Sequence, residues 1–216
     1  MFLLWCALSA AWDDYSTSRF YHPVEVDLPF LDEVSEAVVY LEGGTGVIIS
    51  AGGYILTNQH VAELIGSRSI AWRNRDGHNQ PEGLAISLVA TNPDVDLALY
   101  RADADHPLPH IELRREALPL GEPVVMVSHP RRQTQQISFG HVTAGLAEVG
   151  GIPSIKYSTR TNWGSSGAPV FDAEGRLVAI HRAWFHNPNT NTSGSAGVPV
   201  NYFHDLPWIS AGDVLP

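Results

Sequence analysis

His60, Asp96 and Ser166 follow one another along the chain in an order that catalytic triads use. Serine is a weak nucleophile at neutral pH, so it needs a base within hydrogen-bond reach and donors for the charge that develops on the substrate. His60 can act as that base, and the Asp96 carboxylate can orient its imidazole. The order therefore predicts hydrolysis through a covalent intermediate, with the base and the acid in the first half of the chain and the nucleophile in the second.

The segment around Ser166 reads Gly-Ser-Ser-Gly-Ala-Pro, from Gly164 to Pro169. Glycine on both sides allows a sharp turn, so that the amide groups of Gly164 and Ser166 can point at one spot and form an oxyanion hole. Taken alone, the string is also typical of an ordinary surface turn. The other two positions have similar alternatives, since His60 could be a structural histidine and Asp96 a turn residue at the start of a strand. All three alternatives would have to coincide, in order, to remove the catalytic interpretation.

Short segments rich in Val and Ile, separated by Gly, Pro, Asn or Asp, dominate the rest of the chain and predict strands. Only Gln59–Ile65 and Asn201–Ile209 have helical character, and Asn187–Ser195 is predicted to be a polar, mobile loop. The predicted strands are Ala37–Leu41, Thr45–Ser50, Tyr54–Thr57, Ser69–Arg73, Leu84–Thr91, Leu97–Arg101, Pro123–Val127, Gln136–Gly145, Ser154–Thr159, Ala168–Phe171, Leu177–Arg182 and Gly197–Val200.

Ala102–Leu120 has weak periodicity and three prolines, which indicates a connector between two halves of about six strands each. We therefore predict an all-β fold of two packed six-stranded antiparallel barrels with a short C-terminal helix, although a sandwich would give a similar string. The expected organisation is an N-terminal segment at residues 1–30 and a single domain at residues 31–216. Within that domain, barrel one covers about 35–102 and barrel two about 120–206.

The 216-residue chain has a formal net charge of −10 and no basic run longer than two arginines. Nucleic acids and anionic membranes both select clustered positive charge, so neither is expected as a partner. No pattern of histidines or carboxylates has metal-site spacing, and one cysteine cannot form an intrachain disulfide. The sequence thus predicts a domain without metal ions, and the oligomeric state stays open.

Phe2–Trp12 is an apolar run that is too short to insert across a bilayer. The run is similar to the core of a secretory signal, which favours a secreted or periplasmic location, but the usual positive charge before it is absent. An N-terminal arm that packs on the domain, or a start codon placed too late, fits equally well. A lipid anchor on Cys6 is disfavoured because bulky Trp5 stands where a small residue is needed.

Three blocks of this sequence resemble the signature blocks of trypsin-like, chymotrypsin-clan serine peptidases. They are Thr45-Gly46-Val47 with Thr57-Asn58-Gln59-His60-Val61, then Asp94-Val95-Asp96-Leu97-Ala98-Leu99, then Gly164 to Pro169. The resemblance covers roughly Glu42 to Leu206 and is closest to the bacterial branch, which holds the glutamyl endopeptidases and the high-temperature-requirement proteases. The resemblance implies a double β-barrel with the active site between the barrels, protein or peptide substrates, and a reaction that needs no cofactor.

Within this resemblance, Asp94 competes with Asp96, but the family pattern places the acid directly before Leu-Ala, and His129 becomes a spectator. Ser165 stands where digestive members carry the Asp that receives a new N-terminus, so that mode of activation cannot operate. Ala168 replaces the usual Gly or Ser and is small enough to keep the turn. Two other functions stay open: a non-catalytic peptide-binding relative, and a high-temperature-requirement type of protease with apolar specificity, which would be expected to carry a peptide-binding module after the peptidase.

The resemblance also implies a primary pocket. Trypsin keeps an Asp six residues before its nucleophile, where this chain has Arg160, and a cation there would repel basic substrates. Thr161 and His181 match the Thr and His with which glutamyl endopeptidases hold a substrate carboxylate, because a hydroxyl and an imidazole can donate two hydrogen bonds to it. We therefore expect cleavage after Glu. The alternative is a packed His181 with an apolar pocket formed by Trp163 or Trp184.

Overall fold

The computed structural model describes residues 30–75, 78–130, 135–187, 189, 192–204, 206–210 and 214. Cys6 and the apolar run Phe2–Trp12 lie outside the described residues, as does almost all of the predicted N-terminal segment. Among the described residues, no helix is both long and apolar enough to cross a bilayer.

Six antiparallel strands close the first barrel in the order β1-β2-β3-β6-β5-β4. Helix α1 (Phe30–Ala37) precedes the barrel, and helix α2 (Gln59–Ile65) follows its third strand. The strands are β1 (Val38–Leu41), β2 (Gly44–Ile48), β3 (Tyr54–Thr57), β4 (Arg68–Arg75), β5 (His78–Asn92) and β6 (Leu97–Ala102).

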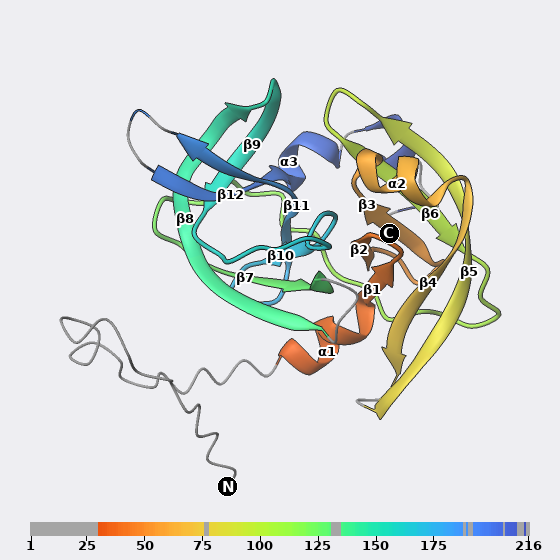
Figure 1. The fold of residues 1–216 in the computed structure, drawn as a ribbon. Helices are drawn as coiled ribbons and strands as arrows, with labels where there is room; N and C mark the ends of the chain where they lie inside the picture. The colour runs from red at the N-terminus through yellow and green to blue at the C-terminus, as the bar shows by residue number, and fades with distance from the viewer. Residues whose placement is uncertain are drawn as a thin grey trace, which may run out of the picture.

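The second barrel closes in the order β10-β11-β12-β9-β8-β7, and in Figure 1 it lies beside the first. Two single-turn helices follow it, α3 (Val200–Phe203) and α4 (Pro207–Ser210). The strands are β7 (Pro123–Ser128), β8 (Gln136–Val149), β9 (Ile152–Tyr157), β10 (Pro169–Phe171), β11 (Leu177–Asn187) and β12 (Thr192–Pro199). The predicted pair of six-stranded barrels is confirmed, with two short helices in place of the single one predicted at Asn201–Ile209.

The two barrels share a packed core. The larger hydrophobic cluster fills the first barrel and continues into Phe171 and Ile180 of the second. Ile209 and Val214, near the end of the chain, belong to this same cluster. A smaller cluster around Met126 fills the interior of the second barrel. Burial of apolar surface between the barrels therefore holds the segments that carry His60 and Ser166 in one rigid unit.

The long hairpins differ from the prediction. Strands β5, β8, β11 and β12 extend well past their predicted ends, and helix α1 was not predicted. The segment predicted as a polar loop is largely paired, with Asn187 opposite Thr192 and His186 opposite Ser193. There the Nδ1 atom of His186 lies 2.9 Å from the Ser193 hydroxyl. Polar residues on both faces of a hairpin outside the core give no alternation of apolar and polar residues, which is why the sequence indicated a loop.

The connector between the barrels binds the start of β11. The amide of Arg114 donates to the carbonyl of Leu177 at 2.9 Å, and the amide of Leu177 donates to the carbonyl of Glu112 at 2.8 Å. The Arg114 guanidinium contacts both Glu122 and the fully buried carboxylate of Asp172. The predicted connector is therefore bound to the second barrel by main-chain hydrogen bonds and ion pairs.

Candidate active site

His60 is the second residue of helix α2, directly after the buried strand β3. The helix begins at Gln59 without a side-chain cap. The residue before it, Asn58, instead donates its side-chain amide N–H to the main-chain carbonyl of Asp96 at 3.1 Å. The main-chain N–H of His60 donates to Oδ1 of Asp96 at 3.1 Å. The start of helix α2 is thus bound to Asp96, the residue that faces His60.

The Asp96 carboxylate lies 2.9 and 3.0 Å from Nδ1 of His60. Asp96 closes the turn between β5 and β6 with a φ of +53°, a strained conformation that turns often show and that Asp tolerates better than most residues. Burial acts to raise the pKa of Asp96, but the hydrogen bond and charge of His60, together with Arg182, hold the pKa below its usual value. Asp96 is therefore an anion at neutral pH and can orient the imidazole.

Asp94, the competing acid, does not contact His60. Its amide donates to the side-chain oxygen of Asn92 at 2.9 Å, in an exposed turn. His129 is buried, with its ring edge-on to Tyr40 at 5.9 Å between centroids, and its main-chain N–H donates to the Thr45 hydroxyl at 3.0 Å. The carboxylate that lies against His60 is therefore that of Asp96 and not that of Asp94.

The Ser166 turn is built against the first barrel. The amide of Thr45 donates to the carbonyl of Ser166 at 2.8 Å, and the Thr45 hydroxyl donates to the carbonyl of Gly164 at 2.8 Å. A Cβ on Gly44 would lie 3.0 Å from that Ser166 carbonyl and 2.8 Å from the side chain of Val61, the residue after His60. The nucleophile turn and the His60 helix therefore meet over strand β2.

Two glycines shape the turn, with φ of +91° at Gly164 and +81° at Gly167. The Ser165 hydroxyl stabilises the turn by accepting a hydrogen bond from the main-chain N–H of Asn162 at 3.2 Å. Among the described residues, none accepts a hydrogen bond from the amides of Gly164 or Ser166, which leaves both donors available to an incoming oxyanion. Ser166 is half-buried, and no hydrogen bond joins its hydroxyl to His60 among the described residues.

The three predicted pocket residues lie in different environments. Arg160 is exposed, and its amide donates to the Ser138 hydroxyl at 2.8 Å. Thr161 is half-buried. His181 is only 3% exposed, and its Nδ1 atom lies 2.8 Å from the hydroxyl of Tyr157. Burial, with the nearby charges of His60 and Arg182, lowers the pKa of His181 to about 3, so its imidazole is neutral at physiological pH.

Arg182 contributes a contact that the sequence did not predict. In the structure its Nε atom lies 3.4 Å from Oδ2 of Asp96, so a cation from the second barrel reaches the acid of the first. No motif signals this, because the contact depends on the packing of one barrel against the other.

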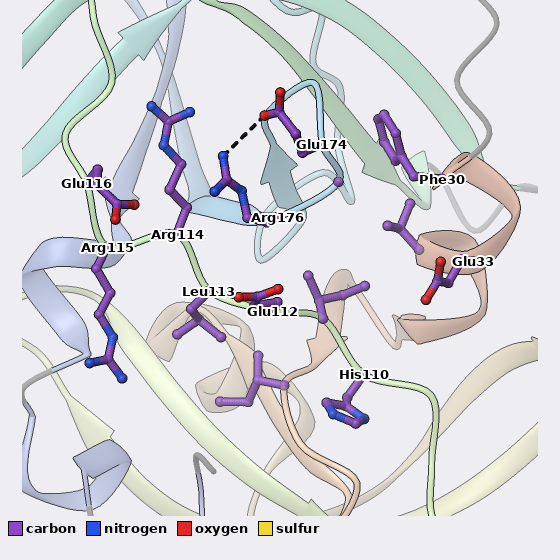
Figure 2. Close-up of a pocket in the computed structure, with 14 residues that line it drawn as sticks. Phe30, Glu33, His110, Glu112, Leu113, Arg114, Arg115, Glu116, Glu174 and Arg176 are labelled. Carbon is purple, nitrogen blue, oxygen red and sulfur yellow. Dashed lines mark hydrogen bonds and ion pairs between the residues drawn. The ribbon is translucent and has the colours of Figure 1, made fainter.

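A large hollow lies elsewhere, between helix α1, the connector and the turn before β11 (Figure 2). Its volume is about 730 Å³, and both acidic and basic side chains line it, among them Glu33, Arg115 and Glu174. None of its lining residues is a predicted catalytic or pocket residue. Among the described residues, no group of three or more histidines, cysteines and carboxylates could hold a metal ion.

Comparison with known proteins gives concordant matches. A probable periplasmic serine endoprotease of the DegP-like type from Pseudomonas putida is 31% identical over 173 residues, which covers 76% of this chain and 34% of the relative. A protein of the same description from Hahella chejuensis is 30% identical over 167 residues, with the same coverage. The chain spans about a third of the length of these curated relatives.

Solved structures share the fold. The HtrA-type protease AlgW with a tripeptide superposes with a TM-score of 0.72 at 25% identity, covering 84% of this chain and 62% of AlgW. The MamO protease domain from Magnetospirillum magneticum superposes with a TM-score of 0.65 at 21% identity, covering 79% of this chain and 95% of that domain, and this likeness bears on the fold alone.

A family description, the trypsin-like peptidase domain, matches residues 44–180. That span is more than half of the chain, and it includes His60, Asp96 and Ser166. The relatives lie on the high-temperature-requirement side of the bacterial branch, while the glutamyl-endopeptidase side has no support from these matches. Together with the two closed barrels, the match shows that the chain belongs to the trypsin-like peptidase family.

Proposed function

We propose that this chain is a serine endopeptidase that cleaves peptide bonds through an acyl-enzyme on Ser166. The observation that carries the proposal is the contact of His60 Nδ1 with both carboxylate oxygens of Asp96, at 2.9 and 3.0 Å. This contact fixes the tautomer that leaves Nε2 of His60 free to accept a proton. His60 is partly exposed, so substrate can reach that face of the ring.

In the proposed reaction, Ser166 Oγ attacks the scissile carbonyl carbon while His60 Nε2 takes the hydroxyl proton. The amides of Gly164 and Ser166 donate to the oxyanion of the tetrahedral intermediate, and the Asp96 anion stabilises the imidazolium. Collapse of the intermediate breaks the C–N bond as His60 returns the proton to the leaving amine. Water, deprotonated by His60, then attacks the ester carbon. The C–O bond to Ser166 Oγ breaks, the carboxylic acid product leaves, and His60 returns the proton to Ser166 Oγ.

Hydrolysis of an unstructured protein tests this proposal. Labelled casein should be cleaved by the wild-type protein, and both Ser166→Ala and His60→Ala should lower the rate by several orders of magnitude. A Ser87→Ala variant serves as a matched control, because it removes an exposed serine hydroxyl of strand β5, outside the proposed site. Equal rates for wild-type protein and Ser166→Ala would instead favour the peptide-binding alternative.

The finer proposal is that Glu is preferred before the cleaved bond. Its support is the Tyr157 hydroxyl, which lies 2.8 Å from Nδ1 of the neutral His181. When Tyr157 donates to Nδ1, the ring proton of His181 sits on Nε2 and can be donated to a substrate carboxylate. Thr161 would donate the second hydrogen bond, and exposed Arg160 would add positive charge at the rim.

Peptides that differ only at the residue before the cut bond test this preference. Glu should exceed Gln, Phe and Lys, and His181→Ala should remove most of the advantage of Glu over Gln. The curated relatives are DegP-like endoproteases, and an apolar pocket of the high-temperature-requirement type is the competing specificity. Preference for Phe or for Lys would contradict the carboxylate pocket and leave the proposed triad intact.

A further inference from the structure

Arg182 interrupts the regular pairing of β11. His181 pairs with Gly197 and Ala183 pairs with Ala196, so Arg182 is the extra residue of a β-bulge. A bulge leaves one residue outside the ladder and re-aims its side chain. Here the side chain leaves the second barrel and ends at Asp96 in the first.

The guanidinium is held from two sides. Its Nε atom lies 3.4 Å from Oδ2 of Asp96, and its Nη1 atom donates to the carbonyl of Val149 at 2.8 Å. Val149 ends β8, and the next residue, Gly150, would bring a Cβ to 4.0 Å from Nη2. The Arg182 side chain is 14% exposed and the Asp96 side chain 11%, so solvent screens this pair weakly.

We propose that Arg182 is a positioning residue for the acid of the proposed triad, an inference that rests on the proposed function. By holding Oδ2, Arg182 limits rotation of the carboxylate and keeps both oxygens on His60 Nδ1. Its fixed positive charge also opposes protonation of the His60–Asp96 pair. Besides His60 and Asp96 themselves, the charged or titratable groups near this pair are Arg182 and the neutral His181. The pKa of His181 responds to the charges of both His60 and Arg182.

Two effects should follow when the charge is removed in Arg182→Gln. The carboxylate gains freedom to rotate, so kcat should fall about 10- to 100-fold while KM changes less than about 3-fold. Loss of a nearby cation makes protonation of the pair easier, so the acid limb of the pH–rate profile should move up by about 0.5 to 2 pH units. Arg182→Lys keeps the charge without the planar fork, so it should restore the pH profile better than it restores kcat.

A titration followed by NMR separates this inference from the proposed function, because it needs no turnover. The side-chain carboxyl ¹³C signal of Asp96, assigned by its absence in Asp96→Asn, should titrate at higher pH in Arg182→Gln than in wild-type protein, because the charge of Arg182 lowers the pKa of Asp96. Arg101→Gln is the matched control, since it removes an exposed charge at the far end of β6. If Arg182→Gln fails to fold, Arg182→Met provides a second neutral variant with a similar stem.

A double-mutant cycle completes the test. In an Asp96→Asn background, Arg182→Gln should change the rate less than about 2-fold, because the residue through which Arg182 acts is already disabled. Equal Asp96 titrations in Arg182→Gln and Arg101→Gln would overturn the inference whether or not the protein cleaves peptides. A wild-type protein with no peptidase activity but with the predicted titration shift would instead contradict only the proposed function.

Discussion

Gly167 lies so close to Thr45 that a Cβ on the glycine would fall 2.0 Å from the Thr45 carbonyl oxygen and 2.2 Å from the hydroxyl of Thr57. The same carbonyl accepts the Thr57 hydroxyl at 2.7 Å, so neither group can move without breaking a buried hydrogen bond. The residue after the proposed nucleophile must therefore be glycine for two independent reasons, its φ of +81° and this contact.

Gly167→Ala should lower the free energy of unfolding by about 3 kcal/mol or more and lower activity with it. Gly121→Ala is the control, because Gly121 has the same φ of +81° but nothing within 4 Å of its added Cβ. That variant should lose only about 1 kcal/mol from backbone strain. Urea unfolding of the two variants measures the difference, and equal losses would show that the contact with Thr45 is unimportant.

Asp96→Asn should cut kcat by about 10³- to 10⁴-fold, because an amide cannot stabilise the His60 imidazolium and favours the wrong tautomer. Asp94→Asn should stay within about 2-fold, since Asp94 makes no contact with His60. Steady-state kinetics on one peptide compares the two variants. Because Asp96→Asn also removes the carboxylate that contacts Arg182, circular dichroism checks that this variant remains folded. A large loss of kcat in Asp94→Asn with little loss in Asp96→Asn would instead assign Asp94 as the carboxylate that orients His60.

His181 should make the protein less stable in acid. Its pKa in the folded state is about 3, against about 6.5 when exposed, so between these values the unfolded chain binds the proton and the folded chain does not. Stability from this group is fully present above pH 6.5 and falls as the pH drops toward 3, with a slope of at most about 1.4 kcal/mol per pH unit. Asp96, whose pKa is lowered, adds a loss only at more acidic pH, below its ordinary value of 3.8.

The measurement for His181 is the free energy of unfolding in urea at pH 7, 6, 5 and 4. Wild-type protein should lose about 2 kcal/mol more than His181→Gln between pH 6 and pH 4. The difference between the two proteins isolates His181 from the other titrating groups. Parallel pH profiles would mean that His181 becomes protonated within the folded state near its ordinary pKa.

Tyr157→Phe should reduce the preference for Glu over Gln by about 3- to 10-fold, because the loss of one hydroxyl frees His181 to adopt the other tautomer. Tyr100→Phe is a matched control, since Tyr100 donates its hydroxyl to the carbonyl of Gly66 at 2.6 Å in the first barrel. The ratio of kcat/KM for the matched Glu and Gln peptides is the readout. Equal Glu-to-Gln ratios in Tyr157→Phe and wild-type protein would show that the Tyr157 hydroxyl does not contribute to the preference for Glu.

Much of this architecture could be predicted because barrel strands alternate with turns of Gly, Pro, Asn and Asp. The buried runs of β1 and β6 and the apolar strand before His60 are strong local signals. Helix α1 was missed because a single eight-residue segment with three acidic residues competes poorly with the strand that follows it. The ends of β5 and β8 were missed because hairpins that extend beyond a core lack an apolar face.

At the site, residue order together with the family pattern predicted the contact between His60 and Asp96. The contact between Arg182 and Asp96 could not be predicted, because it requires a bulge in β11 and two barrels packed together, neither of which has a local sequence signal. The neutral state of His181 also depends on burial, which comes from the whole second barrel. Sequence order thus proposes the candidate reacting side chains, while packing determines their charge and orientation.

Labelling with a fluorophosphonate probe tests the central claim most directly, because the probe reacts with a serine only when a base and an oxyanion hole activate it. The account predicts one covalent adduct on the wild-type protein, located at Ser166 by peptide mass spectrometry. Ser166→Ala should take up no probe, and His60→Ala should react far more slowly. A folded wild-type protein labelled no better than its heat-killed control, or labelled at another residue, would contradict the claim that Ser166 is an activated nucleophile.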